Sequence, residues 1–193
     1  MKNLDKKRIK IVITDLDNTY LGNGFISDFG KSIIQKLIDE NYYVVFATGR
    51  NKELANNAFY NENIYYAVMN GAAIYKGNCL IEKSGYFEKE QLNFLSKYFK
   101  QYNVCVNFIS DYSTICNLNK KQYMETIFKR NVSISGEKAA STIIPTKFIN
   151  DVNTIDENIY KIEVNFNNHN SYLRAYKELS NMKEINIYGS NRD

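Results

Sequence analysis

Two aspartates, Asp15 and Asp17, follow a short apolar run and are separated by a single residue. Residues two apart in extended backbone point to the same side, so the two carboxylates are expected to lie together. Like charges held close repel each other unless a cation or a proton intervenes, and carboxylate oxygens are ligands that Mg²⁺ accepts. One carboxylate is suited to nucleophilic attack and the other to proton transfer. The pair alone is equally compatible with an acidic turn before a helix.

The residues around this pair predict an α/β fold. Buried strands are expected over 10–14, 43–47 and 65–69, with helices over 28–41 and 52–61. This alternation predicts a parallel sheet with right-handed crossovers. Ligands of such sheets bind beyond the carboxyl ends of the strands. Asp15 and Asp17 stand at the first of these ends, and Thr48 stands at the second.

The pattern changes after residue 83, where α+β signals replace the α/β alternation. A hairpin is expected over 73–75 and 80–82, strands over 104–109, 113–118, 147–149, 160–166 and 184–188, and helices over 88–101, 121–129 and 171–182. The segment between the helix 121–129 and the strand 147–149 is a polar stretch to which we assign no element. We therefore divide the chain into residues 1–83 and residues 84–193.

Composition excludes several classes of protein. The chain has 193 residues, of which 44% are hydrophobic and 24% charged, the balance of a soluble globular protein. No apolar run approaches the ~20 residues of a membrane span. The net charge of +4 is dispersed, so nucleic acid is not an expected partner. Three cysteines without a CxxC spacing favour reduced thiols and a cytoplasmic location.

Three motifs together resemble those of the haloacid dehalogenase (HAD)-like phosphatases. Residues 15–19 (DLDNT) match the DxDxT signature after an apolar strand, and residues 47–50 (ATGR) resemble the second motif of the family. Residues 70–72 (NGA) resemble the entry to the cap in the Cof-type subgroup. The resemblance covers essentially the whole chain. It implies an α/β fold: a partial Rossmann-like core with three parallel strands, followed by an inserted α+β cap domain.

The resemblance also implies roles for individual residues. Asp15 would be the nucleophile that accepts a phosphoryl group, and Asp17 would protonate the leaving alcohol and then activate water. Mg²⁺ would be held by the carboxylate of Asp15 and the backbone carbonyl of Asp17. Thr48 would hydrogen-bond a phosphoryl oxygen, and Arg50 would contact phosphate unless it is an exposed arginine at a helix start. The substrate implied is a small phosphorylated metabolite of the cytosol, such as a sugar phosphate or a phosphorylated cofactor.

The sequence also departs from the family pattern. The later lysine motif and the acidic metal-binding loop are not found before Asp193, which predicts a C-terminally truncated member. The strand 10–14 would then form an exposed apolar edge, open to a complementing chain or to self-association. A degenerate, non-catalytic HAD-like protein is therefore the alternative to a phosphatase. A phospho-acceptor receiver domain is a third hypothesis, which residues 48–50 (TGR) and the long α+β segment disfavour.

Overall fold

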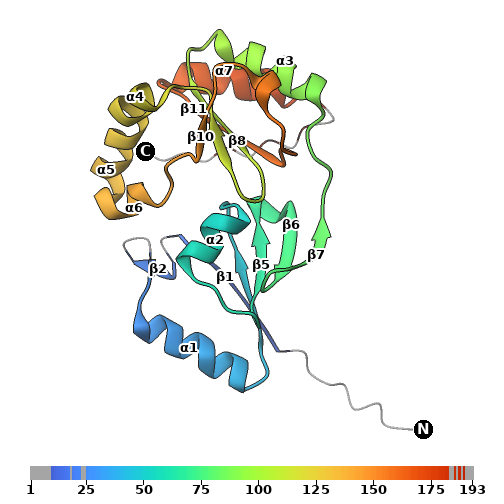
Figure 1. Cartoon of the computed structure of the whole chain (residues 1–193), viewed down its shortest axis with the longest axis vertical. Helices are drawn as coiled ribbons and strands as arrows, with labels where there is room; N and C mark the ends of the chain where they lie inside the picture. Colours follow the sequence, from blue (N-terminus) through green and yellow to red (C-terminus); the bar gives the residue numbers. More distant parts are fainter. Residues whose placement is uncertain are drawn as a thin grey trace, which may run out of the picture.

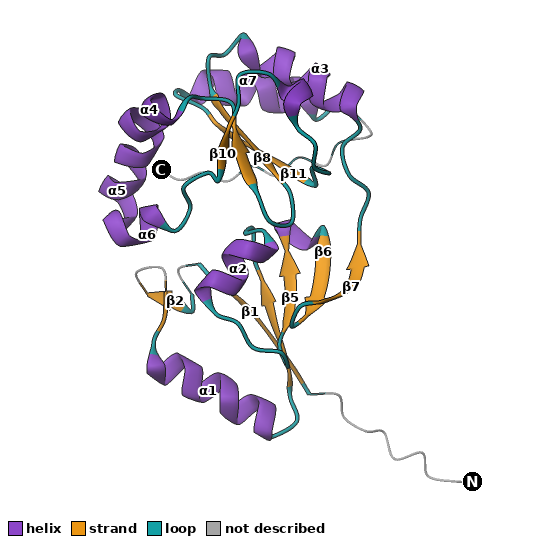
Figure 2. Ribbon diagram, in the orientation of Figure 1, coloured by secondary structure: helices purple, strands orange, loops and turns teal. Residues whose placement is uncertain are grey.

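The computed structural model describes residues 10–17, 19–22, 25–182, 185, 187 and 189, and it arranges them around two main β-sheets (Figure 1 and Figure 2). A five-stranded sheet is formed by the first part of the chain and a four-stranded sheet by the second. A short hairpin of β2 (Leu21–Gly22) and β3 (Phe25–Ile26) separates the first strand from the first helix. The fold class is the predicted one, α/β with a second, mixed sheet.

The first sheet carries the predicted parallel strands. Its order is β1 (Ile11–Asp15), β4 (Tyr43–Ala47), β5 (Tyr65–Val68), β6 (Ala73–Lys76) and β7 (Cys79–Lys83). The strands β1, β4 and β5 run parallel, whereas β6 and β7 form an antiparallel hairpin. Asp15 lies opposite Ala47, so β1 and β4 end at the same edge of the sheet. The residues that follow these two strands are thereby brought together.

Strand β1 ends the sheet in the part of the chain that the structure describes, where its one strand partner is β4. Ile11 is 52% exposed and Ile13 is 63% exposed. An apolar edge of this kind is a template for pairing with another chain. The structure thus has the expected edge, while a complementing chain or self-association remains a prediction.

Two capped helices pack beside the first sheet. The side chain of Ser27 accepts a hydrogen bond from the backbone N–H of Gly30 at the start of α1 (Asp28–Asp39). The side chain of Asn51 likewise accepts a hydrogen bond from the backbone N–H of Leu54 at the start of α2 (Lys52–Ala58). Such caps satisfy backbone donors that have no partner within the helix. The Asn51 cap therefore fixes where the chain turns into a helix, just after residues 48–50.

Helix α2 is shorter than the predicted helix over 52–61. Phe59 has extended backbone (φ −163°, ψ 124°) and ends the helix. The buried hydroxyl of Tyr66 on β5 explains this ending, because it donates to the carbonyl oxygen of Phe59 at 3.0 Å and accepts from the N–H of Asn61 at 2.9 Å. Tertiary hydrogen bonds thus replace the last helical turn.

The second sheet is covered on both faces. Its order is β10 (Lys147–Phe148), β9 (Thr114–Cys116), β8 (Cys105–Ile109) and β11 (Lys161–Asn165). Val106 and Phe108 pack in a cluster with residues of α3 (Lys89–Lys100) and α7 (His169–Leu179). Cys105 packs in a separate cluster with Tyr123 and Ile127. All five residues of β8 are consequently buried, as in a central strand with two covered faces.

The cover of the second face contains elements that the sequence pattern did not indicate. It is built from α4 (Lys120–Tyr123), the π-helical turn η2 (Met124–Phe128), α5 (Lys129–Ser135) and α6 (Glu137–Ser141). The predicted helix over 121–129 corresponds to α4 and η2, and the polar segment after it, to which the sequence pattern assigned no element, is helical as well. Helix α5 buries no residue fully, so it lacks the apolar stripe on which such predictions rest. Gly136 (φ 81°) separates α5 from α6.

The remaining features are two short turns, a predicted strand near the C-terminus and the division of the chain. Two short 3₁₀ turns complete the described elements, η1 (Met69–Gly71) and η3 (Val152–Thr154). The predicted strand 184–188 lies mainly outside the described residues. The first sheet ends with β7 at Lys83, and the division into residues 1–83 and 84–193 stays a prediction. In the described ranges, no helix has the length and apolar character that crossing a membrane requires.

Candidate active site

The chain segments that follow β4 and β5 are joined by backbone hydrogen bonds. The N–H of Thr48 donates to the carbonyl of Ala67 at 2.9 Å, and the N–H of Asn70 donates to the carbonyl of Thr48 at 3.1 Å. The N–H of Met69 donates to the carbonyl of Arg50 at 2.8 Å. These bonds continue the parallel pairing past the strand ends and hold both segments next to Asp15.

A pocket of about 400 Å³ opens at this edge of the sheet. It is lined by Asp15, Ala47, Thr48, Gly49, Ala67, Asn70 and Gly71. The position agrees with the rule that α/β sheets bind ligands beyond the carboxyl ends of their strands. Two of the four predicted site residues, Asp15 and Thr48, thus share one pocket.

Asn70 is a pocket residue that our sequence-based site did not include. Met69 (φ 52°), Asn70 (φ 60°) and Gly71 (φ 91°) all have left-handed backbone, which turns the chain sharply after β5. Asn and Gly tolerate this conformation better than other residues. The Asn-Gly pair after a predicted strand was the available signal, but it does not reveal that Asn70 lines the pocket.

Asp17 and Arg50, the other two predicted residues, form an ion pair. The Nη2 atom of Arg50 lies 2.8 Å from Oδ1 of Asp17, and Nε lies 3.2 Å from Oδ1 and 3.1 Å from Oδ2. The Arg50 side chain is only 7% exposed, whereas that of Asp17 is 43% exposed. As far as the described residues show, neither lines the pocket. The geometry therefore gives Arg50 the role of fixing the orientation of Asp17, and its contact with phosphate remains a prediction.

The oxygen donors near the strand end fit a weakly held hard cation. In the described part of the chain, no group of three or more His, Cys, Asp or Glu side chains is placed to hold a metal ion. Mg²⁺ needs no such group, because it retains several waters and binds through one or two carboxylates together with substrate phosphate. Asp15 is exposed and lines the pocket. Its carboxylate and the backbone carbonyl of Asp17 are thus suitable donors.

A turn of the second sheet docks on the first sheet through Asp111. The hydroxyl of Tyr75 on β6 donates to Oδ1 of Asp111 at 2.8 Å, and Lys83 on β7 forms an ion pair with Oδ2. The N–H of Glu53 donates to the carbonyl of Asp111 at 3.2 Å. Burial acts to lower the pKa of Lys83, but its hydrogen bonds to Asp111 and Tyr160 outweigh that effect and raise it. The turn thus contacts three elements of the first half of the chain.

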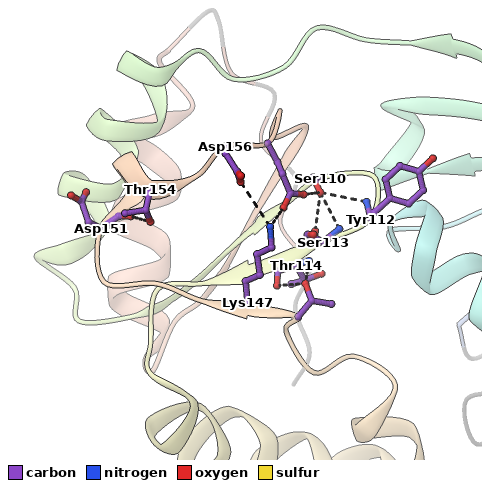
Figure 3. A network of polar contacts seen from close by, with 10 residues as sticks. Ser110, Tyr112, Ser113, Thr114, Lys147, Asp151, Thr154 and Asp156 are labelled. Carbon is purple, nitrogen blue, oxygen red and sulfur yellow. Dashed lines mark hydrogen bonds and ion pairs between the residues drawn. The ribbon is translucent and has the colours of Figure 1, made fainter.

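A network of polar contacts stabilises the conformation of this turn (Figure 3). The hydroxyl of Ser110 accepts from the N–H of Ser113 at 3.0 Å and donates to Oε2 of Glu157 at 2.5 Å, while Lys147 pairs with Oε1 of the same carboxylate. Burial acts to raise the pKa of Glu157, but hydrogen bonds from Lys147, Ser110 and Ser113 prevail and lower it. The network anchors both ends of the turn that carries Asp111.

Strand β11 also reaches the pocket region. The Nζ atom of Lys161 donates to the carbonyl of Gly49 at 2.8 Å, and it pairs with Oε1 of Glu163 at 2.5 Å. A Cβ atom added at Gly49 would lie 3.1 Å from that Nζ atom and 3.0 Å from Oδ1 of Asn70. Gly49 is therefore a point of close approach, where a side chain would push against both groups. Our sequence-based site did not include Lys161.

Comparison with known proteins identifies the family. A family model described as haloacid dehalogenase-like hydrolase matches residues 12–192. A structure of a haloacid dehalogenase-like hydrolase from B. subtilis aligns with a TM-score of 0.79 at 17% identity, covering 95% of this chain and 71% of that chain. A second such hydrolase, from Bacteroides thetaiotaomicron, aligns with a TM-score of 0.73 at 16% identity, covering 95% of this chain and 68% of that chain.

A sugar phosphatase of HAD subclass IIB aligns with a TM-score of 0.58 at 14% identity, covering 80% of this chain and 58% of that chain. At these identities the structures show the shared fold. The search of curated proteins finds no match. The match of the family model over nearly the whole chain, together with the strand order and the second sheet, shows that the chain belongs to the haloacid dehalogenase-like hydrolase family, in its Cof-type subgroup.

Proposed function

We propose that this chain carries the phosphoryl-transfer site of a phosphomonoester hydrolase that uses Asp15 as its nucleophile. The observation that carries the proposal is the pocket that Asp15 shares with Thr48 and Asn70 at the carboxyl ends of parallel strands. Phosphoryl transfer depends mainly on positioning and on charge stabilisation. A carboxylate and nearby hydroxyl and amide groups on joined strand ends supply the positioning.

The reaction consists of two displacements. A carboxylate oxygen of Asp15 attacks phosphorus, the bond from phosphorus to the ester oxygen breaks, and Asp17 gives a proton to the leaving alcohol. Asp17 then takes a proton from water as that water attacks the aspartyl phosphate, which releases inorganic phosphate and restores the Asp15 carboxylate. Splitting the hydrolysis in this way lets an ordinary carboxylate perform the first step. Arg50 keeps the Asp17 carboxylate in place through its two-point contact.

The remaining pocket groups orient the phosphate. The hydroxyl of Thr48 and the amide of Asn70 are suited to hydrogen bonds with phosphoryl oxygens. Mg²⁺ would be held by the Asp15 carboxylate and the Asp17 carbonyl, and when bound it supplies charge stabilisation for the phosphoryl oxygens. A pocket of about 400 Å³ suits a small phosphorylated metabolite such as a sugar phosphate or a phosphorylated cofactor. We place the chain in a reducing, cytoplasmic setting because its three cysteines show no CxxC spacing.

The test is the release of inorganic phosphate from a panel of small phosphomonoesters in the presence of Mg²⁺. The Asp15→Asn variant should lose at least about a thousandfold in kcat/KM, as expected when a nucleophile is removed. Asp39→Asn is the matched control, because Asp39 is an exposed aspartate on α1 and its loss should leave the rate unchanged. Equal rates in Asp15→Asn and the parent chain would refute the proposal. A folded parent chain that releases no phosphate would favour the non-catalytic alternative.

A further inference from the structure

The second sheet places a lysine ammonium group beside the pocket of the first sheet. Lys161 lies at the start of β11, and its Nζ atom is 2.8 Å from the carbonyl oxygen of Gly49, which lines the pocket. The space above Gly49 is bounded by this Nζ atom and by Oδ1 of Asn70, at 3.1 and 3.0 Å from the position of an added Cβ. The ammonium group and a pocket amide therefore face the same point.

The contacts of Lys161 leave its charge available to a ligand. Its side chain is 15% exposed, so its interactions with anions are only weakly screened by water. Its carboxylate partner Glu163 is on the same strand and is 45% exposed, so that carboxylate can be solvated when it is released. An ammonium group has three donors, of which the Gly49 carbonyl and Glu163 engage two.

Arg50 and Lys83 are already committed to other partners. Arg50 follows Gly49 in the chain, yet its guanidinium group contacts both carboxylate oxygens of Asp17. Lys83 pairs with Asp111, and the ring of Tyr160 lies 4.1 Å from its Nζ atom. Of these three cations, Lys161 is therefore the one best placed to bind an anion in the pocket.

We propose that Lys161 is a substrate-binding residue, whose ammonium group binds an anionic oxygen of the phosphoryl group in the pocket. The inference rests on the proposed function, because it assumes that phosphate occupies the space next to Asp15. The bound phosphate takes the place of Glu163 at Nζ, while the Gly49 carbonyl keeps the lysine directed at the pocket. The second sheet then contributes a charge to phosphate binding that the first sheet does not supply.

The test measures the binding of inorganic phosphate by calorimetry, in Mg²⁺, to the whole chain. Lys161→Met should weaken phosphate binding by about tenfold, the effect expected for one charge-assisted hydrogen bond, and Lys161→Arg should restore part of it. Glu163→Gln removes the competing carboxylate and should tighten binding about threefold. The two variants should thus change phosphate affinity in opposite directions. This distinguishes ligand binding from a structural role, since a lysine that merely joins the two sheets would not bind phosphate better when Glu163 is neutralised.

Kinetics separate this inference from the proposed function. With a phosphomonoester that the parent chain hydrolyses, Lys161→Met should raise KM more than it lowers kcat. Asp15-dependent phosphate release with an unchanged phosphate affinity in Lys161→Met would overturn the role of Lys161 and leave the proposed function standing. Weaker phosphate binding in Lys161→Met without any Asp15-dependent release would support the role of Lys161 in phosphate binding and overturn the proposed function. A parent chain that binds no phosphate would overturn the role of Lys161.

Discussion

The two sheets contribute to the site in different ways. The first sheet brings Asp15, Thr48 and Asn70 together through strand order alone, because parallel strands end at one edge. The second sheet contributes single side chains, Asp111 and Lys161, that cross to the first half of the chain. Under the proposed function, the chemistry would depend on the register of β1 and β4, whereas the proposed contact of Lys161 with substrate would depend on how the second sheet docks.

The first prediction concerns the chemistry of the first sheet and is the largest effect expected after that of Asp15→Asn. Asp17→Asn should lower kcat/KM for alkyl phosphates by about a hundredfold to a thousandfold, because kcat/KM reports the steps up to departure of the alcohol and general acid catalysis is lost there. The loss should be much smaller for p-nitrophenyl phosphate, since its leaving group needs no proton. Steady-state rates for both substrate types check this. Equal losses for both would show that Asp17 does not protonate the leaving group.

The second prediction concerns the docking of the second sheet. Asp111→Ala should lower the free energy of unfolding by about 3 kcal/mol, because it leaves a largely buried Lys83 ammonium group and the Tyr75 hydroxyl without their partner. Urea unfolding monitored by circular dichroism measures the change. Asp156→Ala is the control: its side chain is 84% exposed, and its loss should cost less than about 0.5 kcal/mol. A similar small change in both variants would show that Asp111 does not secure the docking.

The third prediction tests a buried cation behind the pocket loop. Lys52 is 1% exposed, and its Nζ atom lies 4.3 Å from the centre of the Tyr66 ring. Burial lowers the pKa of Lys52 to about 8. The unfolded chain, with an ordinary lysine pKa, binds more protons than the folded chain above this value, so stability should rise with pH.

Relative to Lys52→Met, the parent chain should gain about 1.5 kcal/mol of unfolding free energy between about pH 8 and pH 9.5. Parallel urea titrations of the two proteins at both pH values give this difference directly. A difference that does not change with pH would mean that Lys52 keeps its ordinary pKa in the folded chain.

The sequence indicated the strands of both sheets, but it indicated how the strands are arranged only for the parallel part of the first. The strands β1, β4 and β5 are short apolar runs with polar ends, and their alternation with helices determines a parallel sheet. Asp15 and Thr48, which line the pocket, were singled out from the sequence because local motifs follow those strands directly. Asn70 was not predicted as a site residue, because its place in the pocket depends on three successive residues with left-handed backbone.

The second sheet shows why the remaining contacts near the site could not be predicted from the sequence. Lys161 and Gly49 are 112 residues apart, and no local pattern connects them. Asp111 was visible as a turn residue, but its partners Tyr75 and Lys83 come from a different sheet. Helix α5 was missed because it buries no residue fully, so no apolar periodicity marks it. Contacts of this kind follow from tertiary packing.

The most direct test of the account is to trap the phosphoryl group on the chain. The parent chain is mixed with excess phosphomonoester and Mg²⁺, quenched in acid during turnover, digested and examined by mass spectrometry. The account predicts one phosphoryl group on the peptide that contains Asp15, and none on that peptide in Asp15→Asn. Phosphate release by the parent chain with no phosphoryl group on this peptide, and with undiminished release by Asp15→Asn, would contradict it.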